Sequence, residues 1–125
     1  METIHSDQAP QAIGPYAQAI VYNGFVFCSG QTPLDPATMT ITGSTIEEQT
    51  LQVLQNLQAV LSAKDVGIAR IVKTTVFLKN FSDFERMNKV YAAFFGDHRP
   101  ARSTVEVSRL PKDALVEIEC IAALD

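Results

Sequence analysis

A permanent cation and a carboxylate stand in two alternating runs near the end of the chain. Arg102 opens "RSTVEVS", and Glu117 lies fifteen residues later in "LVEIECIAA". Alternation with period two is typical of β-strands that bury one face. If the apolar residues face a core, the opposite face mixes these charges with Leu115 and Ile121. Such a mixture suits a subunit interface that contains a polar site. The alternative is a solvated face with weak surface ion pairs.

The expected faces follow from pointing each apolar set toward the helices that must cover the sheet. In the last run, the residues expected in the core are Val116, Ile118, Cys120, Ala122 and Leu124. In the preceding run, Val105 and Val107 are expected in the core. The open face is then expected to carry Arg102, Thr104, Glu106, Ser108, Glu117 and Glu119.

Composition limits the classes of protein to consider. The 125 residues, 46% of them hydrophobic, predict a single domain over 1–125. Because a chain of this size buries only about two-thirds of its unfolded surface, burial against another subunit would help it. The net charge of −4 and the scattered basic residues argue against nucleic acid as a partner. We expect neither a membrane span nor a secretory signal.

Histidine and cysteine give little support for metal or nucleophile chemistry. His5 and His98 share no metal-ligand spacing, and neither a Ser-His-Asp arrangement nor a glycine-rich phosphate loop is evident. Cys28 and Cys120 each lie in an apolar run and are expected to be buried free thiols in a reducing compartment. We therefore expect the cytoplasm by default, with an organelle such as the mitochondrion left open.

The clearest local signal is an Asn-Gly pair at 23–24 between two alternating runs, which predicts a hairpin with a two-residue turn. The resulting register pairs Tyr16 with Gln31 and places Tyr16 beside Ser29 on one face. Ser29 and Gly30 end the second strand, where a glycine leaves backbone groups open to a ligand. A turn and a short strand at 38–42 follow.

Two helices are predicted from capping and periodicity. Residues 44–65 begin with a possible capping box of Ser44 and Glu47 and carry an apolar stripe at Leu51, Leu54, Leu57 and Leu61, opposite a Gln-rich face that is expected in solvent. Residues 82–95 begin with Ser82 and Glu85, end at Gly96, and are expected to bury Phe84, Met87, Tyr91 and Phe94. Asn88 lies mid-helix among these aromatics, as a polar helix edge or a pocket residue.

Strands are predicted at 71–81, about 103–109 and 114–124. With the hairpin and the helices, they predict an α+β sandwich in which two helices cover one face of a mixed sheet.

Several longer motifs occur in order between about Ile4 and Ala123: "AIGPYAQA", "FCSGQTPLDP", "IVKTTVFLKNFSDFERMNKVYAAFF", "PARSTVEVSRLPKD" and "VEIECIA". Together they resemble the RidA (YjgF) family of reactive-intermediate imine deaminases. The resemblance implies a chorismate-mutase-like α+β fold and a homotrimer whose sheets line a central barrel, with clefts between subunits. It also implies hydrolysis of 2-imino acids, such as 2-iminopropanoate and 2-iminobutanoate, to 2-keto acids and ammonia, without a metal or organic cofactor.

The resemblance also implies a role for individual residues in these motifs. By position, Arg102 would bind the substrate carboxylate, which fits the fork geometry of a guanidinium. Glu117 would orient or activate the attacking water, and Tyr16 takes the third catalytic position. The resemblance assigns substrate contacts to Arg102, Ser29, Gly30, Asn88 and Thr104.

One position departs from the family pattern. Many members have a cysteine where this chain has Thr104. Because the family's substrate contact at this position is made mainly by the backbone N–H, a threonine should form the same contact. Two other functions stay open: a module that binds small carboxylates, or acts as a chaperone, in the same clefts without turnover, and an endoribonuclease. The acidic pI and the absence of a well-placed histidine argue against the ribonuclease.

Overall fold

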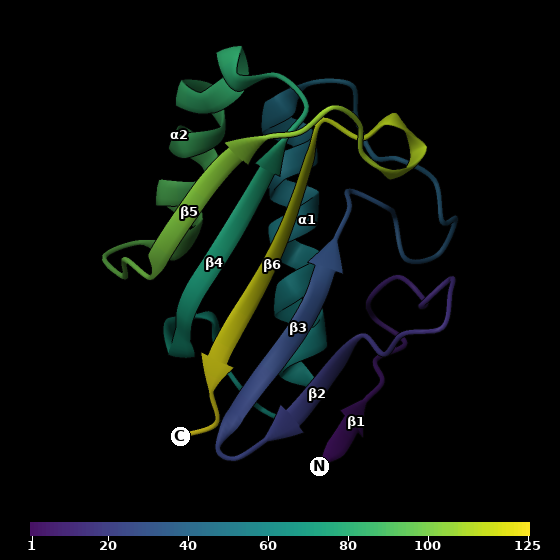
Figure 1. Ribbon diagram of the computed structural model, residues 1–125, viewed down its shortest axis with the longest axis vertical. Helices are drawn as coiled ribbons and strands as arrows, with labels where there is room; N and C mark the ends of the chain where they lie inside the picture. Colours follow the sequence, from purple (N-terminus) through teal and green to yellow (C-terminus); the bar gives the residue numbers. More distant parts are fainter.

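A computed structural model describes residues 1–125 as a six-stranded sheet with two helices on one face (Figure 1). The strand order is β1-β2-β3-β6-β4-β5, and only β4 and β5 run parallel. This confirms the predicted mixed sheet and α+β class. The strands are β1 (Glu2–Ile4), β2 (Ala19–Tyr22), β3 (Phe25–Gln31), β4 (Ile71–Leu78), β5 (Ala101–Glu106) and β6 (Val116–Ala123).

Both helices lie behind the sheet in Figure 1, so the other face of the sheet is uncovered. Helix α1 spans Ile46–Ser62 and α2 spans Phe84–Phe95. Neither is long and apolar enough to cross a membrane. Three short 3-10 turns complete the fold: η1 (Ile68–Arg70), η2 (Phe81–Asp83) and η3 (Pro111–Asp113).

The core lies between the helices and the sheet. In β6 the predicted set is buried from Val116 to Ala122, whereas Leu124 lies beyond the strand and is 38% exposed. In α1, Leu54 and Leu57 are fully buried, but Leu51 is 42% exposed and does not belong to the apolar stripe. Truncating a buried leucine of this kind to alanine typically costs about 2–5 kcal/mol.

Several local predictions need correction. The capping box of α1 is formed by Thr45 and Glu48, one residue later than predicted. Helix α2 has no capping box, because η2 leads directly into it. The expected strand at 38–42 is reduced to an isolated bridge of Ile41 with Leu34. The polar face of α1 is not wholly in solvent: Gln49 is buried and its amide oxygen accepts from the Leu115 N–H at 2.8 Å.

The hairpin prediction is confirmed at its turn. Tyr22 pairs with Phe25, and the two turn residues take positive φ angles of 54° and 84°, the conformation for which Asn-Gly is favoured. The pairing does not extend to Tyr16, because β2 begins only at Ala19.

The predicted face of β5 is wrong. Arg102 pairs with Thr74, which pairs with Cys120, and both of these neighbours are buried on the helix side. Neighbouring residues in register point to the same face of a sheet, so Arg102 points toward α2. Val105 is 43% exposed and lies in register, through Phe77, with Glu117 on the open face. Thr104 and Glu106 alternate with Val105, so they also lie on the helix side.

Candidate active site

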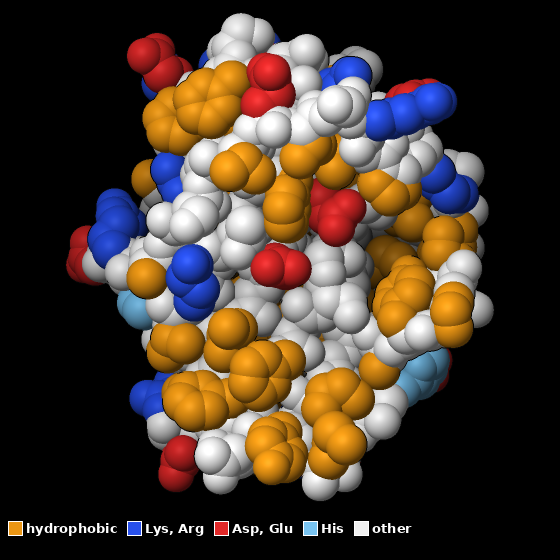
Figure 2. Space-filling view, in the orientation of Figure 1, with side chains coloured by type: hydrophobic (Ala, Val, Ile, Leu, Met, Phe, Trp, Pro, Cys, Tyr) orange, Lys and Arg blue, Asp and Glu red, His pale blue; other side chains and the backbone are white.

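A cavity of about 520 Å³ opens on the uncovered face at the end of β3. Its fourteen lining residues include Tyr16, Ser29, Gly30 and Glu117, so the structure brings together four of the predicted site residues. Figure 2 shows acidic side chains near the middle of this face and hydrophobic side chains gathered toward its lower end. We call this cavity, with these four residues, the acid pocket.

A register shift in β3 places two of the lining residues. Cys28 pairs with Cys120 and Gln31 pairs with Ile118, so β3 carries one extra residue between these pairs. Such a bulge bends the strand and redirects its side chains. The Ser29 hydroxyl donates to the Ala17 carbonyl at 2.6 Å, which fixes the bulge against the segment before β2.

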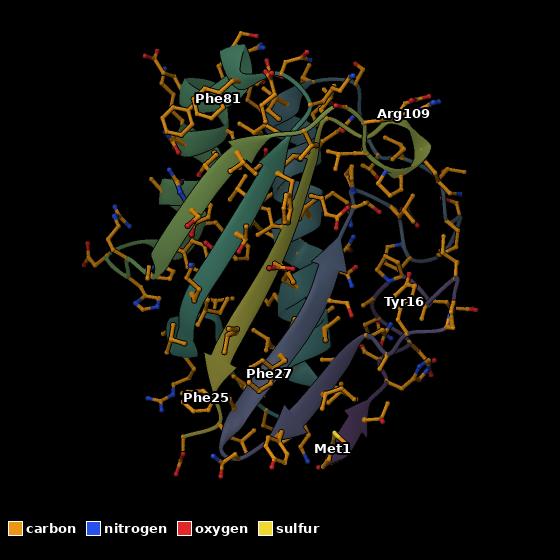
Figure 3. All side chains as sticks on the ribbon, in the orientation of Figure 1. Met1, Tyr16, Phe25, Phe27, Phe81 and Arg109 are labelled. Carbon is orange, nitrogen blue, oxygen red and sulfur yellow. The ribbon has the colours of Figure 1, made fainter.

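The wall of the acid pocket is a segment held by one buried glutamine. The Gln18 side chain accepts from the Ser6 N–H at 2.6 Å and donates to the Pro10 carbonyl at 2.8 Å. These bonds hold the chain that leads to Tyr16, whose side chain is half exposed and whose hydroxyl accepts weakly from the Ile13 N–H at 3.3 Å. Figure 3 shows Tyr16 beside the sheet, away from β5.

Gly30 lies directly under the Glu117 carboxylate. A Cβ added at Gly30 would overlap the carboxylate oxygen and lie 2.9 Å from its Cδ. A glycine in a strand often marks a place where another group approaches closely. Gly30 is therefore what lets the Glu117 carboxylate lie against the backbone of β3.

The surroundings of the Glu117 carboxylate raise its affinity for a proton. Burial raises the pKa of Glu117, because a half-buried carboxylate loses hydration, and the charge of Glu119 raises it further. Arg102 does not contribute to this shift, as its position on the opposite face requires. A carboxylate with a pKa raised toward neutrality is better matched to general-base work at physiological pH.

The remaining predicted residues form a second group on the helix side, at the β5 edge. The Arg102 guanidinium lies 4.8 Å from the ring centroid of Tyr91 and 5.6 Å from that of Phe84. Asn88 lies between these two aromatics at helical spacing, so it shares their face of α2. Thr104 lies two residues beyond Arg102 on the same face of β5. We call Arg102, Asn88 and Thr104, with the two rings, the guanidinium cluster.

The guanidinium cluster has polar groups without partners. Arg102 forms no salt bridge with any carboxylate of the chain. The Oδ1 atom of Asn88 and the Oγ1 atom of Thr104 are buried and have no hydrogen-bond partner. Buried polar atoms of this kind are uncommon in native proteins and call for an explanation such as a ligand. The sheet separates this cluster from the acid pocket, so one chain does not bring Arg102 to Glu117.

Residues outside the predicted set also shape the site. The sequence interpretation noted that Phe84 and Tyr91 flank Asn88, but it assigned both rings to the core and did not connect them with Arg102. Gln18 and Glu119 also contribute, through the pocket wall and through the pKa of Glu117. No three His, Cys, Asp or Glu side chains gather in an arrangement that could hold a metal ion.

Comparison with known proteins identifies the family. The family described as Endoribonuclease L-PSP matches residues 6–124, nearly the whole chain. The chain belongs to this family, the RidA (YjgF) family. The sequence motifs had indicated the same family. A structure of a conserved Rid-family protein, YyfA of Yersinia pestis, superposes with a TM-score of 0.95 at 50% identity, covering 98% of each chain.

Relatives within the RidA family carry different names. A RutC family protein of Pyrococcus horikoshii is 51% identical, over 97% of this chain and 96% of its own. The chloroplastic Reactive Intermediate Deaminase A of Arabidopsis thaliana is 44% identical, over 98% of this chain and 66% of its own. The family thus includes reactive-intermediate deaminases.

Proposed function

We propose that the protein hydrolyses 2-imino acids to 2-keto acids and ammonia, in clefts formed between copies of the chain. The observation that carries the proposal is the separation of the acid pocket and the guanidinium cluster on opposite faces of one sheet. A second copy that laid its β5 edge against the open face would bring its Arg102 to the Glu117 of the first. Exposed apolar residues on that face, including Phe25, Phe27 and Val105, support such an interface (Figure 3).

The proposed assembly is the homotrimer expected from the RidA resemblance. Three chains of 13.7 kDa give a particle of 41.1 kDa. In a ring of this kind each contact is head to tail, so every cleft takes one half from each of two neighbours. A mass near that of one or two chains, measured by light scattering, would contradict the trimer.

In the proposed mechanism Arg102 binds the substrate carboxylate through two parallel N–H bonds and so orients the imine in the acid pocket. Ionised Glu117 accepts a proton from a water molecule as the water oxygen bonds to the imine carbon. That proton passes to the nitrogen and gives a tetrahedral intermediate with a hydroxyl and an amino group on one carbon. Transfer of the hydroxyl proton to the nitrogen then breaks the C–N bond, so that ammonia leaves as the keto group forms. Tyr16 and Ser29 border the reacting centre. The name of the Arabidopsis relative supports a deaminase of this class.

The decisive experiment is subunit complementation. Glu117→Gln and Arg102→Ala chains, each inactive alone, are mixed in equal amounts, unfolded, refolded together and assayed for keto acid formation from imines generated by an amino-acid oxidase. In randomly assembled trimers about a quarter of the clefts contain both native residues, so about a quarter of wild-type activity should return. A site within one chain would recover no activity. If wild-type protein does not accelerate imine hydrolysis at all, the proposed reaction is wrong.

An endoribonuclease function receives less support from the geometry, despite the description of the family. The acid pocket contains Glu117 and Glu119, whose negative charges oppose an RNA phosphate. Neither histidine lines the cavity: the His5 ring bonds to Asp7 at the surface, and His98 Nε2 donates to the Ile71 carbonyl at 2.7 Å. RNA cleavage that persisted through purification and disappeared in Glu117→Gln would favour the ribonuclease.

A further inference from the structure

The Arg102 guanidinium is positioned by aromatic rings and not by another charge. It lies over Tyr91 at 4.8 Å and over Phe84 at 5.6 Å, both within the range of a cation–π interaction. Tyr91 is only 5% exposed, which strengthens the attraction because water does not compete for the ring. We call these two rings the aromatic shelf.

The ring of Tyr91 is itself fixed by a buried hydroxyl pair. Its hydroxyl lies 2.7 Å from the hydroxyl of Thr74, a fully buried residue of β4. Thr74 is also the residue that pairs with Arg102 in the sheet. Burial raises the pKa of Tyr91, so the hydroxyl stays protonated and able to donate. On another side, the ring of Phe95 packs at 4.7 Å and limits how Tyr91 can turn.

We propose that Tyr91 is a positioning residue that, held by Thr74 and assisted by Phe84, presents Arg102 to the substrate carboxylate. This inference rests on the proposed role of Arg102 as carboxylate binder. A guanidinium is planar and can stack on a ring while its N–H groups remain free at the edge of the plane, which a lysine ammonium cannot reproduce. With no carboxylate of the chain to hold it, Arg102 depends on the aromatic shelf for its orientation.

The test compares variants of Tyr91 in the assembled protein. Tyr91→Leu removes the ring, and calorimetry with 2-oxobutanoate should show binding about thirty-fold weaker, the value of a desolvated cation–π contact. KM for imine hydrolysis should rise by a similar factor, while kcat changes by less than about two-fold. Tyr91→Phe keeps the ring and should recover most of the affinity. Phe94→Leu, at a partly buried ring of the same helix that does not lie over Arg102, is the control.

A second measurement separates positioning from folding. The ring current of Tyr91 should shift the Arg102 side-chain protons upfield in NMR spectra, and the shift should disappear in Tyr91→Leu but persist in Tyr91→Phe. If Tyr91→Leu does not fold, Phe84→Leu, at a partly exposed ring, tests the same shelf by the same two readouts. Unchanged keto-acid affinity and unchanged Arg102 shifts in a folded variant would overturn the inference.

The two proposals fail in different ways. If the wild-type protein binds 2-oxobutanoate but hydrolyses no imine, and Tyr91→Leu weakens that binding, the catalytic proposal is wrong and the positioning inference stands. If imines are hydrolysed and Tyr91→Leu has wild-type KM, the positioning inference alone is wrong.

Discussion

The acid pocket and the guanidinium cluster differ in how completely one chain satisfies them. In the acid pocket, Ser29 donates to a backbone carbonyl, a bulge and a glycine make room for Glu117, and a cavity is already open. In the guanidinium cluster, Arg102 has no anionic partner, and buried oxygen atoms of Asn88 and Thr104 lack hydrogen bonds. The first region already forms an open cavity around its carboxylate, whereas the second presents a guanidinium for which one chain supplies no carboxylate.

From this difference we expect the two regions to have different roles in the reaction. A guanidinium without an anionic partner contributes mainly to binding, whereas a cavity containing a carboxylate of raised pKa contributes mainly to turnover. Because the two regions lie on opposite faces, the proposed cleft depends on a contact between copies of the chain. Variants of each half should therefore have distinct kinetic signatures.

The largest effect is expected from Glu117→Gln, which tests whether the acid pocket contributes to turnover and not to binding. Loss of the general base should lower kcat by about 10²–10⁴-fold, while calorimetry shows nearly unchanged 2-oxobutanoate affinity. The neutral amide should not lower the melting temperature, because the raised pKa means that folding disfavours the ionised carboxylate at neutral pH. Glu85→Gln, at an exposed position of α2, is the control. A large loss of affinity with unchanged kcat would assign Glu117 to binding instead.

An intermediate effect is expected from Gly30→Ala. The new methyl group displaces the Glu117 carboxylate from the backbone of β3, and a misplacement of this size should lower kcat by about 10–100-fold. The atoms that it meets belong to the flexible end of a side chain, so the fold should persist with a similar melting temperature. Gly67→Ala, where nothing lies within 4 Å, is the matched control. Wild-type kcat in Gly30→Ala would show that the close approach is unnecessary.

The smallest effect sharpens the electrostatic part of the comparison. Glu119 raises the pKa of Glu117, so Glu119→Gln should lower that pKa. Because the base acts when ionised, activity falls as the pH drops through this pKa, and the acid limb of the kcat profile should move to lower pH. At alkaline pH the variant and the wild type should match. An acid limb that does not move would mean that another group controls it.

The sequence contained enough information for the features that depend on local chemistry or on full burial. The Asn-Gly turn needs positive φ angles that few residue pairs accept, so the hairpin could be located to the residue. β6 is flanked by β3 and β4 and covered by α1, so its alternation had a single interpretation. The family motifs allowed the overall fold to be predicted as well.

The face of β5 could not be predicted for a physical reason. β5 is an edge strand that is covered incompletely, and its valines were assigned to the core because they are apolar. They lie instead on the open face, where the proposed partner would cover them. Alternation tells which residues share a face, but not which face meets the helices. The division of the candidate site between two faces was hidden by the same ambiguity.

The side chains that support the site were missed because their chemistry resembles that of ordinary core. Tyr91 and Phe84 are aromatic residues at helical spacing, and only their distance to Arg102 distinguishes them from packing residues. The caps were misplaced for a related reason: adjacent serine, threonine and glutamate at 44–48 fit more than one capping box.

The thiols of Cys28 and Cys120 can be used to measure how often the two strands beside the acid pocket separate. They face one another on the helix side of β3 and β6, the two strands that carry Ser29, Gly30 and Glu117 on the other side. A hydrogen bond with Cys28, together with burial, raises the pKa of Cys120, so almost none of the reactive thiolate forms while the strands are paired. Because both side chains are also buried, a disulfide reagent should label Cys120 mainly while β3 and β6 are separated, and the labelling rate would report how often these two strands separate.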